Sequence, residues 1–185
     1  MFARLFRRDT AAEAIASALY GAIVAQARTP AFYAGFGVPD TVDGRFEMVV
    51  LHAALLLDRI YRGDEAAQGI GQRVFDLFCA DMDRSLREMG IGDLGVPKRM
   101  KKMTEAFYGR AQAYRAAIAA GDRPTLAEAL TRNVYRREGA AADRDALALA
   151  DYVIASAGRL AAAPPLADPP AFAECVTFQP ARSVA

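Results

Sequence analysis

The chain has 185 residues, 54% of them apolar, and a formal net charge of +1. This length suffices for one domain with its own core, and the balanced charge excludes a global attraction to nucleic acid or to anionic membranes. Abundant alanine and few β-branched runs favour packed helices over sheets. Because no apolar run reaches the ~18–20 residues that span a bilayer, we expect a soluble protein.

The first segment, residues 1–9, mixes three arginines with two phenylalanines and a leucine. Such a basic amphipathic segment fits contact with an anionic membrane surface, and it equally fits a terminus that packs weakly on the domain. It lacks the apolar stretch of a secretory signal. Thr10 and Glu13 match a capping box, which predicts a first helix from Thr10 to about Arg28, before Pro30.

A short aromatic connector, residues 30–37, precedes a much more apolar helix that opens at Val38 and ends near Gly63. Apolar side chains occupy more than one face of this helix, which is typical of a helix at the centre of a bundle. It carries the only histidine, His52. We interpret His52 as structural, because a lone histidine in such a helix lacks catalytic partners.

The next two helices flank a glycine-rich turn. The first runs from Glu65 or Ile70 to Met89, and the second begins near Pro97, a residue favoured in the first turn of a helix. Gly90 suits a left-handed C-cap. Gly109 lies inside the second helix, where glycine costs ~1 kcal/mol against alanine, and it predicts the close approach of a neighbouring helix.

Four of the five residues from Lys98 to Lys102 are cationic. They lie at a helix N-terminus, where the helix dipole disfavours each cation by roughly 0.3–1 kcal/mol at low salt. This local conflict marks a candidate partner-binding surface, and a solubilising face is the alternative. Met100 and Tyr108 stay open between core packing and partner contact. We assign to the core the apolar stripe of the same helix: Met103, Phe107 and Tyr114.

Two further helices complete the predicted fold. One is capped near Asp122 and ends at Gly139, and the last begins near Asp143. We therefore predict an all-α protein, a single compact bundle of about six to seven helices. Its expected parts are a basic segment at 1–9, a helical domain at 10–162 and an extended proline-rich tail at 163–185 that packs on the domain.

The sequence carries no recognisable catalytic or metal-binding motif. Cys79 and Cys175 lie outside any metal-ligand spacing and are expected to be reduced thiols. Asp81 and Asp83 are the nearest approach to a diphosphate–Mg²⁺ motif, but the second acidic helix that such enzymes use is missing. We expect no enzyme activity, no cofactor and no small-molecule substrate.

From Leu86 to Lys101 the sequence reads Leu-Arg-Glu-Met-Gly-Ile-Gly-Asp-Leu-Gly-Val-Pro-Lys-Arg-Met-Lys, and Phe-Tyr-Gly-Arg follows at residues 107–110. The stretch from Asp81 to Arg115 resembles the signature of the ubiquinol–cytochrome c chaperone family. The resemblance implies an all-helical, non-enzymatic chaperone of bacterial type. Its client would be newly made cytochrome b, or another bc1 subunit, during assembly of the cytochrome bc1 complex. The expected place is cytoplasmic, peripheral at the cytoplasmic face of the bacterial inner membrane.

We expect cations in this stretch to guide a client and carboxylates to supply countercharge. The candidate partner-binding residues are Asp81, Asp83, Arg87, Asp93, Lys98, Arg99, Lys101, Lys102, Tyr108, Arg110 and Arg115. Two other classes of function stay open: a membrane-surface adaptor, and a ribosome- or nucleic-acid-binding helical adaptor. Both would use the basic cluster. No nucleic-acid-reading motif accompanies it, so nucleic acid is the less expected partner.

Overall fold

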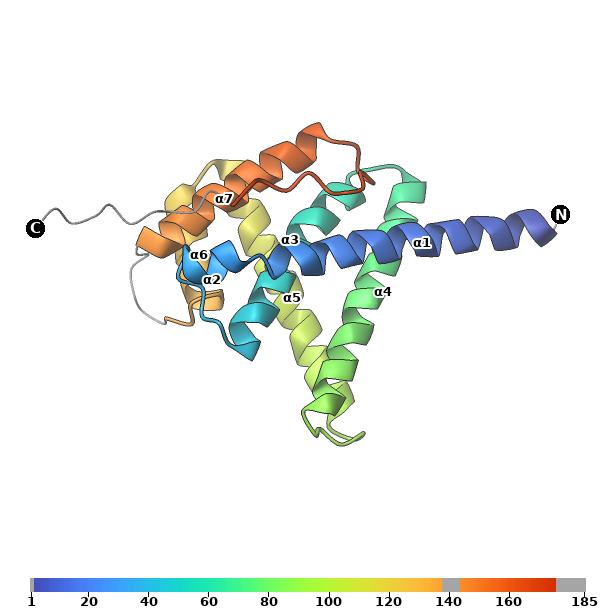
Figure 1. Ribbon diagram of the computed structural model, residues 1–185, viewed down its shortest axis with the longest axis horizontal. Coiled ribbons are helices and arrows are strands. Elements are labelled where there is room, and N and C mark those ends of the chain that lie inside the picture. The colour runs from blue at the N-terminus through green and yellow to red at the C-terminus, as the bar shows by residue number, and fades with distance from the viewer. Residues whose placement is uncertain (1, 138–143, 176–185) are drawn as a thin grey trace, which may run out of the picture.

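The computed structural model describes residues 2–137 and 144–175, which contain seven helices and no strand (Figure 1). The helices are α1 (Phe2–Ala27), α2 (Pro30–Ala34), α3 (Val42–Tyr61), α4 (Glu65–Glu88), α5 (Val96–Ala120), α6 (Arg123–Asn133) and α7 (Arg144–Ala162). The all-α prediction is confirmed. Within the described residues, none of the helices combines the length and the apolar character needed to cross a membrane.

Helix α3 is the centre of the bundle, because it contacts α1, α4, α5 and α7. Its buried side chains occupy more than one face of the helix, as the sequence predicts. The helix begins at Val42, a few residues after the predicted start. The Thr41 hydroxyl caps it by accepting a hydrogen bond from the Gly44 N–H at 3.1 Å.

His52 links three helices inside the core. Its Nδ1 donates to the Met48 carbonyl at 2.7 Å, and its Nε2 accepts a hydrogen bond from the Tyr152 hydroxyl at 2.8 Å. The Gln26 side chain of α1 donates to the same hydroxyl at 3.0 Å. Burial lowers the pKa of His52 to about 4, so the ring is neutral at neutral pH. This geometry agrees with a structural role.

The described part of the C-terminal tail lies against the helices. Phe172 is buried beside His52, with ring centres 5.2 Å apart. The Arg59 guanidinium of α3 donates to the Ala163 carbonyl at 2.7 Å. Residues 176–185 of the predicted tail lie outside the described residues, and the predicted domain limits stay predictions.

Two local predictions are wrong. Helix α1 begins at Phe2 and not at Thr10. No glycine or proline lies between residues 2 and 9 to break a helix, and a capping box is a local preference that a continuing helix overrides. Gly109 is exposed, and a Cβ placed there would meet no heavy atom within 4 Å. No helix of the described chain therefore approaches it closely.

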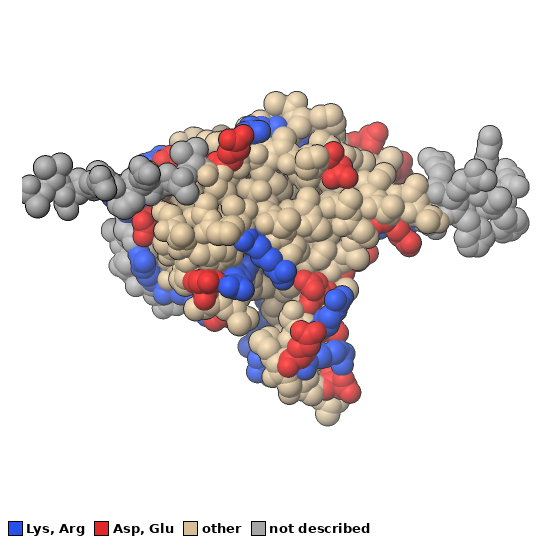
Figure 2. Space-filling view, viewed as in Figure 1, with Lys and Arg blue, Asp and Glu red and all other residues tan. Residues whose placement is uncertain are grey.

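The end of α4 and the start of α5 project from the rest of the bundle and meet in a turn (Figure 1). Gly90 follows α4 with a φ of +81°, the left-handed conformation that the sequence predicts. Arg87 donates to Asp83 at 2.7 Å and also pairs with Asp93, which holds the turn against α4. Figure 2 shows cationic and acidic side chains intermixed over this projecting hairpin.

Candidate functional site

A groove opens between α3, α4 and α5, beside the end of α1; we call it the hairpin groove. Its volume is about 570 Å³, within the range of ligand sites. Apolar side chains from the three helices make up much of its lining: Phe46, Val49, Met82, Leu86, Met103 and Ala106. Two further apolar side chains of the lining, Val42 and Met89, are largely exposed. The groove therefore offers apolar surface to solvent.

The helical repeat aims these side chains into one space. Residues three, four or seven apart lie on the same side of a helix. Helix α4 contributes Met82, Leu86 and Met89 at such spacings, and α5 contributes Lys102 and Ala106. Only one side of α5 faces the groove, so the basic run from Lys98 to Lys102 is divided between two faces.

Six cationic side chains line the groove: Arg28, Arg45, Arg99, Lys102, Arg110 and Arg136. Three have carboxylate partners, since Arg45 pairs with Asp40, Arg110 with Glu47 and Arg136 with Asp43. The other three, Arg28, Arg99 and Lys102, make no ion pair within the described residues. Asp81 is the one carboxylate of the lining that makes no ion pair within the described residues, so these three cations outnumber it and the site is suited to an acidic partner.

Glu47 of α3 lies in the groove lining, with only 2% of its surface exposed. Nη2 of Arg110 forms an ion pair with its Oε1 at 2.8 Å. Burial raises the pKa of Glu47 to about 7, against the opposing charges of Arg110 and Arg136. Oε2 of Glu47 and Nε of Arg110 are buried and have no hydrogen-bond partner among the described residues.

The raised pKa of Glu47 makes folding stability depend on pH. The folded state holds this proton up to about pH 7, whereas the unfolded chain releases it near pH 4.5. The folded state therefore binds more protons over this interval, and the free energy of unfolding falls as the pH rises. From about pH 5 to pH 7 this group removes about 2 kcal/mol.

The variant Glu47→Gln lacks this titration and isolates the effect. Urea unfolding at several pH values gives the difference in unfolding free energy between wild type and variant. We expect the unfolding free energy of the wild type, relative to that of the variant, to fall by about 2 kcal/mol from about pH 5 to pH 7. A difference that is constant with pH would contradict the assignment.

The structure brings four of the eleven predicted partner-binding residues into the groove: Asp81, Arg99, Lys102 and Arg110. Asp81 also accepts a hydrogen bond from the Tyr20 hydroxyl at 2.7 Å, which fastens α4 to α1. Arg110 is mostly buried against Glu47 rather than being an exposed guide.

The other predicted residues lie elsewhere. Asp83, Arg87 and Asp93 form the ion-pair cluster at the hairpin turn. Lys98 and Lys101 are exposed outside the groove lining. Tyr108 is 56% exposed, and its ring centre lies 5.5 Å from that of Phe75 and 5.6 Å from that of Phe107.

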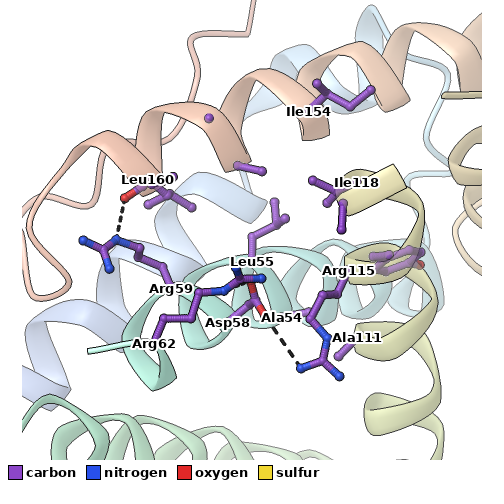
Figure 3. Close-up of a pocket in the computed structure, with 15 residues that line it drawn as sticks. Ala54, Leu55, Asp58, Arg59, Arg62, Ala111, Arg115, Ile118, Ile154 and Leu160 are labelled. Carbon is purple, nitrogen blue, oxygen red and sulfur yellow. Dashed lines mark hydrogen bonds and ion pairs between the residues drawn. The ribbon is translucent and has the colours of Figure 1, made fainter. Parts of the chain in front are cut away.

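Arg115 lines a separate cavity of about 370 Å³ between α3, α5 and α7 (Figure 3). Much of its wall is small and apolar, with Ala54 and Ala111 on facing helices. Arg115 and Arg62 both pair with Asp58, at 3.8 Å and 2.8 Å. Both arginines therefore share one carboxylate partner, whereas Arg28, Arg99 and Lys102 of the hairpin groove have none among the described residues.

Sequence reasoning missed several groove residues, chiefly Glu47, Arg28 and Phe46. One signal was available, because Glu47 is an acid in the apolar run of the central helix. Arg28 and Phe46 carry no comparable signal. Their place in the groove depends on how α1 and α3 pack against the hairpin.

The structure is that of an all-helical protein with an amphipathic groove. Residues 34–167 match the family model for the ubiquinol-cytochrome C chaperone, so the chain belongs to that family. It is similar to the Cbp3 homolog from Brucella abortus, known from a crystal structure. The two share 47% identity and a TM-score of 0.78, over 87% of this chain and 88% of that one. A comparison with curated proteins gives no significant match.

Family membership confirms the resemblance seen in the sequence. It supports a general role as a chaperone in assembly of the ubiquinol–cytochrome c reductase (bc1) complex. A chaperone family is not an enzyme class, in line with the expectation of a non-enzymatic protein.

Proposed function

We propose that this chaperone holds newly made cytochrome b, and that the hairpin groove is where it does so. The observation that carries the proposal is the combination of exposed apolar lining with three cations that have no ion-pair partner among the described residues, Arg28, Arg99 and Lys102. A membrane protein awaiting assembly presents apolar segments flanked by charged loops. The groove matches both parts of such a segment.

The apolar lining is suited to a client of variable shape. Three of its members are methionines, Met82, Met89 and Met103. Methionine side chains are unbranched and repack readily, so they accept different apolar side chains at little cost. A groove of about 570 Å³ holds a few side chains of a client segment rather than a whole folded domain.

Arg28, Arg99 and Lys102 would orient the client and increase the rate at which it is captured. Charges at the edge of an interface steer encounter and fix register more than they add affinity. Arg28, Arg99 and Lys102 would draw in the acidic residues or lipid-facing carbonyls that flank an apolar segment. We expect such a contact to make the protein a peripheral partner of the client, at the cytoplasmic face of the inner membrane.

Removing this protein from the cells that produce it tests the proposal. We expect cytochrome b and the assembled bc1 complex to fall together, and a plasmid-borne copy to restore both. An affinity-tagged copy should co-purify with cytochrome b while assembly is blocked downstream. Normal bc1 levels in the deletion strain would reject the assembly role, and restored assembly without co-purification would reject cytochrome b as the client.

The two alternative functions of the basic cluster, as a membrane-surface adaptor or a nucleic-acid-binding adaptor, predict different results in binding experiments. A membrane-surface adaptor would sediment with anionic vesicles in the absence of any client, and high salt would release it. A nucleic-acid binder would show a gel shift that weakens steeply with salt. Either result without cytochrome b capture would replace the chaperone proposal.

A further inference from the structure

The pair formed by Glu47 and Arg110 is an unusual feature of the groove. An ion pair, with Nη2 of Arg110 2.8 Å from Oε1 of Glu47, joins the two side chains. The remaining oxygen of Glu47 and the Nε–H of Arg110 are buried without a partner in the described part of the chain. Both residues belong to the groove lining. The pair thus has one buried acceptor and one buried donor that no described residue uses.

Folding alone does not account for this pair. Buried polar atoms are nearly always hydrogen-bonded, and leaving one unpaired costs about as much as a lost hydrogen bond. Apolar residues of similar size commonly replace a buried ion pair with no loss of stability. From Phe46 to Leu51, Glu47 is the only charged residue of α3, with Phe46 and Met48 as its neighbours. The two open atoms therefore point to a ligand that completes the pair.

The chemistry of the open atoms selects the ligand. A cationic group would meet the charge of Arg110, and an anionic group would meet Glu47. A neutral group that donates one hydrogen bond and accepts another satisfies both atoms at once. An amide does so, with its N–H directed to Glu47 and its carbonyl to the Nε–H of Arg110.

We propose that Glu47 and Arg110 form a receptor for one amide group of the client segment held in the hairpin groove. The proposal rests on the groove function proposed above and adds a specificity to it. The groove would select an apolar segment that carries one amide in register, rather than any apolar segment. The amide comes either from a side chain, Asn or Gln, or from a backbone peptide group of an irregular stretch.

A peptide series tests this specificity with the full-length protein. The host is a Leu–Ala peptide with Asp residues at both ends, which matches the unpaired cations, and its central residue is Leu, Asn or Asp. We expect the wild type to bind the Asn peptide about tenfold more tightly than the Leu peptide. The Asp peptide should bind no better than the Leu peptide.

A fourth peptide separates the two sources of the amide. It has Leu at the centre and a methyl group on the central backbone nitrogen, which removes that N–H. A preference for Asn over Leu supports a side-chain amide. Equal binding of Asn and Leu peptides with weakened binding of the methylated peptide supports a backbone amide. If all four peptides bind equally, the receptor is rejected while the groove function stands.

The double variant Glu47→Met with Arg110→Met provides the matched receptor-free groove. It should bind the Leu peptide, the Asn peptide and the methylated peptide with equal affinity, because neither source of the amide then has a receptor. A single variant, Glu47→Gln, keeps the shape of the site, and its amide nitrogen cannot accept. It should lose most of the preference even if the double variant fails to fold. Unchanged preference in the folded variants would overturn the proposal. Absence of binding to every peptide by the wild type would reject the groove function and the receptor together.

Discussion

Reversing the charges of Arg99 and Lys102 together is expected to weaken capture of cytochrome b by about a hundredfold. Both side chains line the hairpin groove and lack an ion pair among the described residues. The change Arg99→Glu with Lys102→Glu turns attraction of an acidic client into like-charge repulsion, which costs several kcal/mol at a close interface. Co-purified cytochrome b, measured against total cytochrome b by immunoblot, reports the effect.

A matched control variant distinguishes the effect of charge within the groove from the effect of net charge alone. The change Lys98→Glu with Lys101→Glu alters net charge equally, on side chains that lie outside the groove lining. Lys101 is only loosely paired, with Glu105 at 3.9 Å. We expect this control to keep most of the capture. Equal loss in both double variants would mean that the charge of the whole region matters, and not the groove.

The largest expected effect on folding comes from Gly44→Ala, with a loss of about 3 kcal/mol in unfolding free energy. A Cβ at this position would overlap the Pro39 carbonyl oxygen. That oxygen already accepts a hydrogen bond from the Thr41 N–H at 2.9 Å, so the backbone must move at the start of α3. The movement also breaks the Thr41 cap and shifts Phe46 in the groove.

Gly69→Ala is the control for this prediction. Gly69 lies within α4, and a Cβ there would meet nothing within 4 Å. Alanine should stabilise the helix by roughly 0.5–1 kcal/mol, because it loses less conformational entropy on folding. Urea unfolding of the two variants should therefore shift in opposite directions. An unfolding free energy of Gly44→Ala equal to that of the wild type would contradict this prediction, because it would mean that the loop before α3 shifts at little energetic cost.

Much of the fold follows from local signals in the sequence. The broad apolar girth of α3 predicts a central helix, and Gly90 and Pro97 mark the turn of the hairpin. These signals work because helix periodicity, caps and glycine conformations act over a few residues. The prediction for the start of α1 is wrong for the same reason. The capping box at Thr10 is a strong local pattern, and only the residues before it show that the helix begins earlier.

The groove is less accessible to sequence reasoning, because it forms where separate helices meet. The basic run at the start of α5 is visible as a charge pattern. Its division into groove-lining Arg99 and Lys102 and outward Lys98 and Lys101 depends on how α5 is rotated in the bundle. The pairing of Glu47 with Arg110 joins residues far apart in the sequence, and no spacing rule predicts it.

Photo-crosslinking from within the groove tests the central claim most directly. A crosslinking residue at Met89, exposed in the groove, is compared with one at Ile154, at the edge of the α3–α5–α7 cavity. Both variants are produced in cells that synthesise cytochrome b. We expect crosslinks to newly made cytochrome b from position 89 and none from position 154. Crosslinks from position 154 alone would contradict the assignment of the groove as the client-binding site.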